Sequence, residues 1–261
     1  MKAEEGLLGR SVFDAQVAAV VSFGSFPAPG KPPCRSARGG AGAPLDRRKQ
    51  LTAIDEQRPI MTAPAADPAP LGLAAFALTT FLLSAFNAGW MKAASGLAWL
   101  GYAFAYGGLA QFCAGMWEFR NRNVFGATAF GTYGAFWIGL ALYVELVGKD
   151  LLAHLVTVPL FQKDVGWILL SFAIFNTYML LWSSLANAAV FAVFLTLEAT
   201  EIILFIGFFS ANANVIKVGG YVGIVTAAVA WYTSAAGVVN GMRGGAPTLP
   251  VGKPLWAPRA S

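Results

Sequence analysis

Five long uncharged stretches constrain this chain more than any other feature of its sequence. They cover residues 68–91, 93–117, 123–144, 165–197 and 218–242. A helix needs about 20 apolar residues to cross roughly 30 Å of hydrocarbon, so each stretch is long enough to span a bilayer. Lipid offers no water to bond backbone polar groups, and helices satisfy those groups internally. The chain is therefore predicted to be an all-α, polytopic membrane protein.

The stretch 165–197 is too long for a single span. We expect a break near Ser183, Ser184 and Asn187 that separates a fourth helix from a fifth. The fifth helix would continue to about Phe209, because only two charged residues interrupt its apolar sequence. This division predicts a six-helix transmembrane bundle.

Charge separates the first part of the chain from the rest. From Met1 to Asp67 there are nine Lys or Arg and seven Asp or Glu, whereas the longer remainder holds nine basic and six acidic residues. Residues 24–49 are rich in Gly, Pro, Ala and Arg, a composition that cannot offset chain entropy by burial, so we expect disorder there. The predicted parts are a disordered or non-native extension at 1–60 with Met61 as the alternative initiator, a transmembrane domain at 61–245, and a cytoplasmic tail at 246–261.

The basic residues near the span ends indicate an orientation, because Lys and Arg concentrate on the cytoplasmic side. Six spans place both termini on one side. With the termini inside, the cytoplasmic side holds Arg58, Arg120, Arg122, Arg243, Lys253 and Arg259, against Lys92, Lys149, Lys163 and Lys217 outside. We predict a plasma (inner) membrane protein with cytoplasmic termini. No basic face is interleaved with aromatic residues, which argues against nucleic acid as a partner.

Ionisable residues within a span are functional candidates, because an unpaired charge in hydrocarbon is unfavourable. Glu198 and Glu201 lie three residues apart on one face of the fifth helix, where their repulsion favours a proton on one of them. We consider them candidates for proton coupling or gating. The alternative is that they bond to polar groups of a neighbouring helix or lie in a wet contact between subunits.

Neutral polar residues within the spans can replace part of the hydration shell of a small carboxylate. A neutral lining suits passage, because binding must stay weak enough for release. The alternative for each residue is a hydrogen bond between helices. The candidates for substrate binding are Thr79, Thr80, Asn87, Gln111 and Thr132.

Small residues four apart mark expected helix contact faces, which join helices either within one subunit or between subunits. The third span carries Ala127, Gly131, Ala135 and Gly139, and the sixth carries Gly219, Gly223 and Ala227. His154, the only histidine, falls in an expected loop from Lys149 to Asp164.

The sequence does not contain the residue sets that common catalytic sites require. One His and two separated Cys provide no metal set, no redox ligand set and no Ser-His-Asp order, so we expect neither an enzyme nor a cofactor or metal. A non-transporting membrane sensor or assembly protein stays open as an alternative to a transporter, because helical packing alone permits both.

Two blocks carry a family signature: DPAPLGLAAFALTTFLLSAFNAG at 67–89 and YGGLAQFCAGMWEFRNRNVFGATAFGTYGAFW at 106–137. The first resembles the Asn-Pro-Ala-Pro-x-Gly-Leu motif and first helix of the acetate uptake transporter family, also called the YaaH or succinate/acetate permease family. The second is a long block specific to that family. Asp67 stands where the family usually has Asn. The resemblance covers nearly everything after Met61 and nothing before it.

This resemblance implies six transmembrane helices and assembly as a homo-hexamer with one pathway per subunit. It implies acetate and related short monocarboxylates as substrates, with the dicarboxylate succinate as a further candidate. We expect transport through an anion channel or by proton-coupled uptake. The resemblance also implies a hydrophobic constriction, which motif position assigns to Phe76, Tyr133 and Leu197. An apolar ring of this kind can gate by dewetting. Ordinary helix packing is the alternative for each ring residue.

Overall fold

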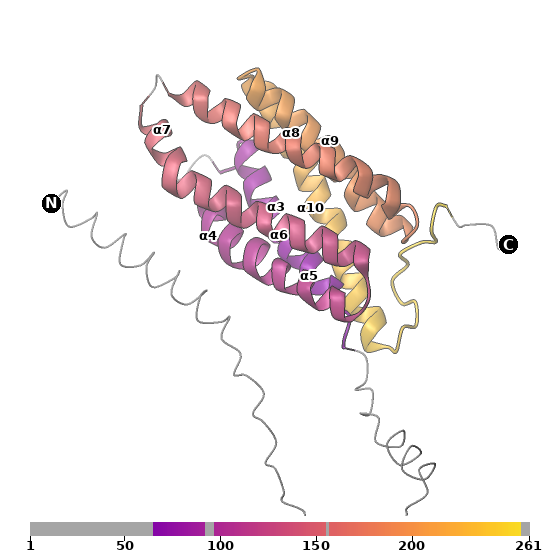
Figure 1. Ribbon diagram of the computed structural model, residues 1–261. Coiled ribbons are helices and arrows are strands. Elements are labelled where there is room, and N and C mark those ends of the chain that lie inside the picture. The colour runs from indigo at the N-terminus through magenta and orange to yellow at the C-terminus, as the bar shows by residue number, and fades with distance from the viewer. Residues whose placement is uncertain (1–64, 92–96, 155–156, 257–261) are drawn as a thin grey trace, which may run out of the picture. The chain divides into compact units, whose positions relative to one another are not determined.

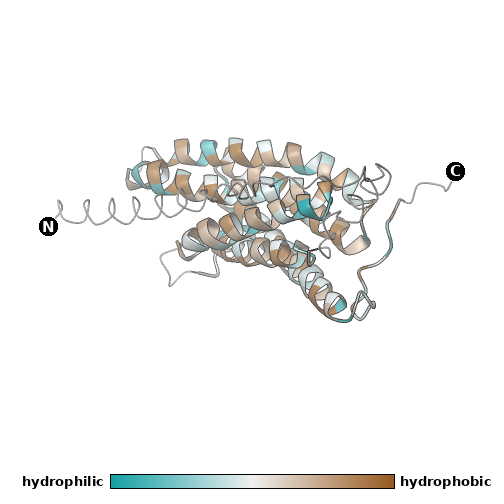
Figure 2. Cartoon of the chain, turned by 60° about the horizontal axis from the view of Figure 1, so that its bottom comes forward, coloured by the Kyte–Doolittle hydropathy of each residue, from teal (hydrophilic) through white to brown (hydrophobic). Residues whose placement is uncertain are grey.

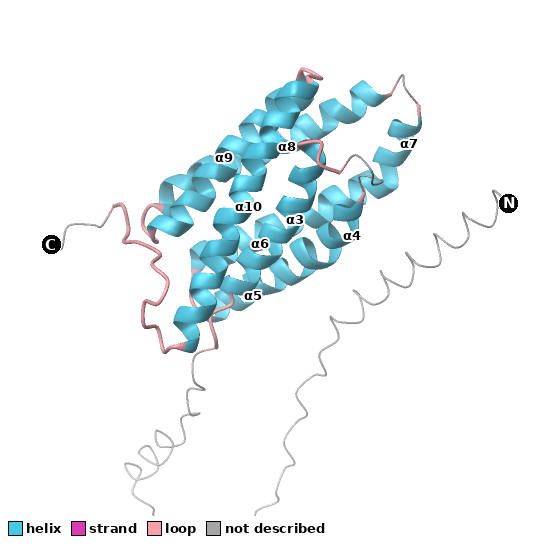
Figure 3. Cartoon of the chain, turned by 180° about the vertical axis from the view of Figure 1, so that it is seen from behind, coloured by secondary structure: helices cyan, strands magenta, loops and turns pink. Residues whose placement is uncertain are grey.

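The uncharged stretches form helices, whose backbone hydrogen bonds are satisfied within each segment. The computed structural model describes residues 65–91, 97–154 and 157–256, which belong to one compact unit, Thr62–Ser261. Within these residues the chain consists of helices joined by turns and contains no strand (Figures 1 and 3). In chain order the helical segments are α3 (Ala69–Asn87), α4 (Ala98–Phe104), η1 (Ala105–Ala110), α5 (Gln111–Arg120), α6 (Val124–Tyr143), η2 (Val144–Gly148), α7 (Lys149–Ala153), α8 (Val158–Ser183), α9 (Ala188–Phe209) and α10 (Ala213–Met242). The predicted extension at 1–60 lies outside the described residues.

Five helices of the described chain are long and apolar enough to cross a membrane: Ala69–Asn87, Val124–Ala153, Val158–Ser183, Ala188–Phe209 and Ala213–Met242. The sixth span is the continuous helical run of α4, η1 and α5, from Ala98 to Arg120. At 1.5 Å per residue this run is about 35 Å long, which is sufficient to span hydrocarbon. The predicted six-helix, all-α bundle is thus confirmed.

The outer faces of the helices are hydrophobic, as lipid contact requires. Large apolar side chains such as Ile174, Leu181 and Val225 are exposed. Figure 2 shows apolar residues along the helices, with only scattered hydrophilic positions. The chain is therefore an integral membrane protein.

The second span contains a π-helical segment, η1, where the helix packs tightly against α3. A Cβ atom on Gly107 would collide with the Thr79 side chain, and one on Gly108 would lie 2.6 Å from the Ala103 carbonyl oxygen. The Thr79 hydroxyl donates to the Ala75 carbonyl at 3.1 Å and also lies 3.4 Å from the Tyr102 carbonyl oxygen. A π-turn widens the helix by one residue, and here glycine makes the close approach to α3 possible.

The predicted break between the fourth and fifth spans is confirmed. α8 ends at Ser183 and α9 begins at Ala188. The Asn187 side chain accepts a hydrogen bond from the Val190 N–H at 2.9 Å and thereby caps α9. The C-terminal segment packs on this turn, where Val251 accepts from the Ala189 N–H at 2.9 Å.

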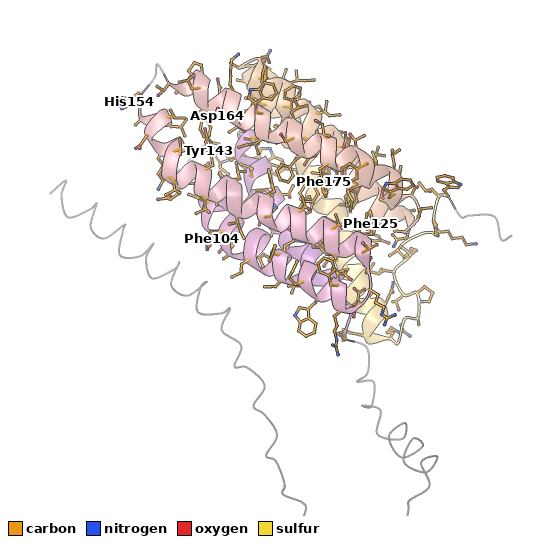
Figure 4. The ribbon with its side chains drawn as sticks, in the orientation of Figure 1. Phe104, Phe125, Tyr143, His154, Asp164 and Phe175 are labelled. Carbon is orange, nitrogen blue, oxygen red and sulfur yellow. The ribbon has the colours of Figure 1, made fainter. Side chains whose placement is uncertain are left out.

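The expected loop from Lys149 to Asp164 is wrong, because helix continues on both sides of a short turn. α6 runs on through η2 and α7 to Ala153, and α8 begins at Val158. Lys149 pairs with Glu145 one turn earlier at 2.5 Å, an arrangement that supports helix despite the charges. The Tyr143 hydroxyl donates to Asp164 at 2.8 Å between the facing ends of the two helices, near the exposed His154 (Figure 4).

Small residues set the closest helix contacts. α10 packs against α3 and α9, α8 against α9, and α5 against α6. The predicted row Gly219, Gly223 and Ala227 of α10 is buried, as expected. In the α6 row Ala127 is buried and Gly131 is half-buried, whereas Ala135 and Gly139 are exposed, so for these two a contact between subunits stays a prediction. The α5 contact uses the adjacent face: a Cβ on Gly115 would lie 2.6 Å from the Gly131 nitrogen, and one on Gly134 would lie 2.7 Å from the Phe112 nitrogen.

Candidate functional site

Three aromatic and aliphatic side chains from separate helices meet at the middle of the bundle. They are Phe76 of α3, Tyr133 of α6 and Leu197 of α9, and all three are buried. The rings of Phe76 and Tyr133 stand edge to face, with centroids 5.8 Å apart. All three residues line a cavity of about 40 Å³, which we call the central cavity. The structure thus brings together the three residues expected to form a constriction.

The central cavity lies between two larger cavities along the helices. The wide cavity, about 760 Å³, is lined by Asp67, Glu118, Asn123, Tyr178 and Asn187 among others. The apolar cavity, about 100 Å³, is lined by Phe86, Trp99, Leu140, Val144 and Phe161 among others, and shares Leu83, Asn87 and Phe136 with the central cavity.

The order of lining residues along the helices places the three cavities in series. Along α3 the wide cavity takes Leu73, the central cavity Phe76 and Thr80, and the apolar cavity Phe86. Along α9 the same order gives Phe194, then Leu197 and Glu201, then Phe208. α6 repeats it with Phe130, Tyr133 and Leu140. The three cavities therefore follow one another between α3, α6 and α9, and the central cavity has the smallest volume of the three.

The central cavity contains polar atoms that lack a partner. Thr80 Oγ1, Trp137 Nε1 and Glu201 Oε2 are buried without a hydrogen bond among the described residues, and all three residues line this cavity. An unpaired buried polar group costs about 1–3 kcal/mol. These atoms provide a hydroxyl, an indole N–H and a carboxyl oxygen, which together suit a small ligand that both donates and accepts.

A hydrogen-bond network fixes one wall of the cavity. The Asn176 amide nitrogen donates to the Phe194 carbonyl at 3.0 Å and to Glu198 Oε2 at 2.7 Å, which turns the amide oxygen toward Tyr133. The Tyr133 hydroxyl oxygen lies 2.9 Å from this oxygen and 3.2 Å from Glu201 Oε1. A hydroxyl has one proton to donate. Both contacts are hydrogen bonds only when Glu201 carries a proton and donates it to Tyr133.

Comparison with known proteins gives the family. The model of the GPR1/FUN34/yaaH family matches residues 51–244. The chain belongs to this family. The match begins upstream of Met61, so the likeness to the GPR1/FUN34/yaaH family reaches further toward the N-terminus than the sequence motifs indicated.

Several members of the GPR1/FUN34/yaaH family are similar to this chain over most of its described part. Acetate permease A of Emericella nidulans is 39% identical over 185 residues, which cover 67% of this chain and 62% of that protein. The chain therefore spans less than two thirds of the length of this fungal relative. The succinate-acetate/proton symporter SatP of Escherichia coli K12 is 36% identical over 189 residues, which cover 72% of this chain and 96% of SatP.

A solved structure of the GPR1/FUN34/yaaH family agrees with the fold described above. The structure of the bacterial acetate channel SatP superposes with a TM-score of 0.63 at 34% identity. The match covers 72% of this chain and 99% of that channel. The six-helix arrangement is therefore shared across nearly the whole solved chain.

Only some of the polar residues that the sequence singled out face the central cavity. Thr80, Asn87 and Glu201 line it. Thr79 does not, because its hydroxyl lies between α3 and the second span. Thr132 is half-buried and lines none of the three cavities.

Glu198 and Gln111 also lie outside the three cavities. Glu198 accepts from Asn176 at 2.7 Å and from the Thr177 hydroxyl at 2.8 Å, which is the structural alternative considered for it. Gln111 is buried, and its Oε1 has no partner among the described residues. These placements separate Glu198 from Glu201, which the sequence had treated as a pair.

Trp137 and Thr200 line the central cavity and were not singled out from the sequence. Residues four apart share a helix face, so Trp137 lies on the same face as Tyr133, one turn further along. Thr200 lies three residues after Leu197 and bonds the Thr226 hydroxyl of α10 at 3.0 Å. Helical spacing from the ring residues would have found both.

Proposed function

We propose that this protein carries acetate and related short-chain monocarboxylates across a membrane, through the wide, central and apolar cavities. The observation that supports this most directly is the central cavity itself, where Thr80, Trp137 and Glu201 present three unpaired polar atoms inside an apolar ring. The names of the relatives point the same way, since one is an acetate permease and another a succinate-acetate/proton symporter.

The size of the central cavity favours acetate over longer acids. A cavity of about 10–15 Å³ holds one water molecule. The central cavity, with about 40 Å³, therefore holds three or four non-hydrogen atoms. Acetate has four. Succinate has eight, and its passage requires the ring side chains to move further apart. We therefore place succinate at the upper limit of what the pathway admits.

The cavity binds the substrate best when the site and the acid share one proton. The Trp137 N–H and the Thr80 hydroxyl donate to a carboxylate, and a protonated Glu201 adds a third hydrogen bond. Two ionised carboxyl groups in this space repel each other. Transfer of the proton from Glu201 to the bound anion yields a neutral acid, which leaves through the apolar cavity. Glu201 then regains a proton from the side on which the anion entered, so each cycle moves one acetate with one proton.

A channel for the anion alone is the second mode, in which Glu201 keeps its proton throughout. An acid with a solution pKa of about 4 to 5 gives the same net movement as an anion with a proton or as a neutral molecule. The two modes therefore differ only in whether a pH gradient drives accumulation of acetate beyond its passive distribution.

The orientation follows from the charges at one end of the bundle. Ser234 of α10 donates to the Pro70 carbonyl at 2.6 Å, and Asn121 bonds the Ala66 carbonyl at 3.4 Å, so the start of α3 lies beside the end of α5 and the last part of α10 (Figure 1). Arg120, Arg122 and Arg243 belong to this end. We place it, and both termini, on the cytoplasmic side of the plasma membrane.

We also propose assembly as a homo-hexamer with one pathway per subunit. The exposed small residues Ala135 and Gly139 of α6 suit close helix contacts between copies. Crosslinking in native membranes followed by mass measurement tests this number directly.

Uptake of radiolabelled acetate into proteoliposomes tests the proposed function. We expect protein-dependent uptake above that of protein-free liposomes, which report passive entry of acetic acid. A membrane sensor or assembly protein would bind acetate without moving it. Binding without flux would therefore reject transport and favour that alternative.

A further inference from the structure

One buried carboxyl group lies outside the central cavity and has no part in the pathway described so far. Glu118, in the last turn of α5, is only 1% exposed. Its Oε2 accepts from the Asn123 amide nitrogen at 3.1 Å. Its Oε1 is buried and has no hydrogen-bond partner among the described residues. A carboxylate has about four acceptor positions, so this group is far from satisfied.

The local fold holds this carboxyl in place. Asn123 is the N-cap of α6, where its side-chain oxygen accepts from the Gly126 N–H at 3.1 Å while its amide nitrogen holds Glu118. A Cβ atom on Gly126 would lie 2.7 Å from Glu118 Oε1, so only glycine leaves room for the carboxyl at this position. The N-terminus of α6 favours a negative charge nearby, whereas burial disfavours it.

Glu118 lines the wide cavity, whose lining residues Leu73, Phe130 and Phe194 each come about one turn before a lining residue of the central cavity. Asp67 lines the same cavity and caps α3 by accepting from the Ala69 N–H at 2.9 Å. Tyr178 of α8 is the other titratable residue in the lining, and α9 contributes the neutral Asn187. The exposed Arg120 and Arg122 follow in the connector, but neither is among the residues that line the cavity. A carboxylate substrate in the wide cavity therefore meets acidic groups, and no basic side chain of the described residues lines this cavity.

We propose that the protonation of Glu118 controls which charge form of a monocarboxylate enters the pathway from the wide cavity. When Glu118 is ionised, it repels the anion and admits the neutral acid. When Glu118 is protonated, the repulsion is removed and its hydroxyl can donate to a passing carboxylate. This inference rests on the proposed transport function. It assigns selection of the charge form to Glu118, which lines the wide cavity rather than the central cavity that contains the ring.

Equilibrium exchange of radiolabelled acetate in proteoliposomes, with the same pH on both faces, tests this role without requiring a single orientation of the protein. Glu118→Gln removes the charge and keeps the shape. We expect its exchange rate at pH 7.5 to exceed that of the wild-type protein roughly threefold to tenfold, because the anion no longer meets this charge. At pH 5.5 the two rates should converge. A rate equal to that of the wild type at both pH values would overturn the proposal.

A second variant keeps the proposal testable if Glu118→Gln does not fold. Asp67→Asn keeps an oxygen that can cap α3 and removes the other acidic charge of the cavity. We expect a smaller increase in the same direction at pH 7.5. Glu145→Gln is the control, because Glu145 is exposed and lines none of the three cavities. If Glu118→Gln lowers exchange equally at both pH values while Asp67→Asn changes nothing, Glu118 is merely structural and the proposal fails.

The outcome for this inference is separable from that for the proposed function. A wild-type protein that exchanges no acetate at either pH contradicts transport itself. Wild-type exchange with an unaltered pH profile in Glu118→Gln contradicts only the role of Glu118.

Discussion

The hydroxyl oxygen of Tyr133 lies 3.2 Å from Oε1 of Glu201, so a ring residue and a carboxyl group of the same cavity are joined across the contact of α6 with α9. The same hydroxyl is 2.9 Å from Asn176 Oδ1. Its single proton can go to one of these acceptors at a time. The protonation of Glu201 therefore decides where the Tyr133 hydroxyl donates, and in the proposed mechanism this link couples the central cavity to a proton.

Glu201→Gln should separate movement of acetate from movement of a proton. The amide keeps a donor toward the cavity but cannot release a proton at any pH used for transport. We expect accumulation driven by an inward proton gradient to fall about tenfold or more, while exchange of labelled acetate at equal pH continues. Uptake under both conditions in proteoliposomes measures this. Gradient-driven accumulation at the wild-type level would contradict the proton-carrying role.

Glu198→Gln is the matched control for that experiment. Glu198 accepts from Asn176 and Thr177 and lines none of the three cavities. We expect coupled uptake to persist and thermal stability to fall, because hydrogen bonds to a charged acceptor contribute about 1.5–3 kcal/mol each. Loss of coupling in both variants would show that the two carboxyl groups act together.

Two substitutions at Tyr133 should separate the ring from its hydroxyl. Tyr133→Phe keeps the aromatic contact with Phe76 and removes the link to Glu201, so we expect size selection to hold while the pH dependence of uptake changes. Tyr133→Ala should open the central cavity and admit larger acids several-fold faster. Competition of acetate uptake by a series of unlabelled monocarboxylates of increasing length measures both effects. Equal competition profiles in all three proteins would remove Tyr133 from the constriction.

Trp137→Phe should weaken substrate binding without closing the route. It deletes the unpaired Nε1–H and retains an aromatic ring, which is smaller than the indole. Loss of one hydrogen bond to a charged group weakens binding by about 1.5–3 kcal/mol, which raises KM roughly tenfold or more. We expect the maximal rate to change much less. An unchanged KM would mean that this N–H does not contact the substrate.

The sequence predicted the spans and the break at Asn187 because length, charge and capping are local properties. It did not predict which polar residue faces the pathway. Thr79 and Thr80 are adjacent in α3, yet only Thr80 lines the central cavity. Likewise Glu201 reaches the cavity and Glu198 bonds α8. A helix that is apolar on every side has no amphipathic pattern to indicate which face turns inward. Packing against the other helices decides which polar residue faces the cavity, and the sequence does not show that packing.

The close contact of α5 with α6 should limit stability, and the chain offers a control for testing it. Gly115→Ala places a Cβ 2.6 Å from the backbone nitrogen of Gly131, and a backbone atom cannot rotate away. We expect a loss of about 1–3 kcal/mol in the free energy of unfolding. For a domain of this size that corresponds to a Tm lower by about 2–10 °C. Gly101→Ala in α4, where nothing lies within 4 Å of the added atom, should leave Tm unchanged or slightly raised in detergent melts. Equal melting of the two variants would show that the helices separate readily at this contact.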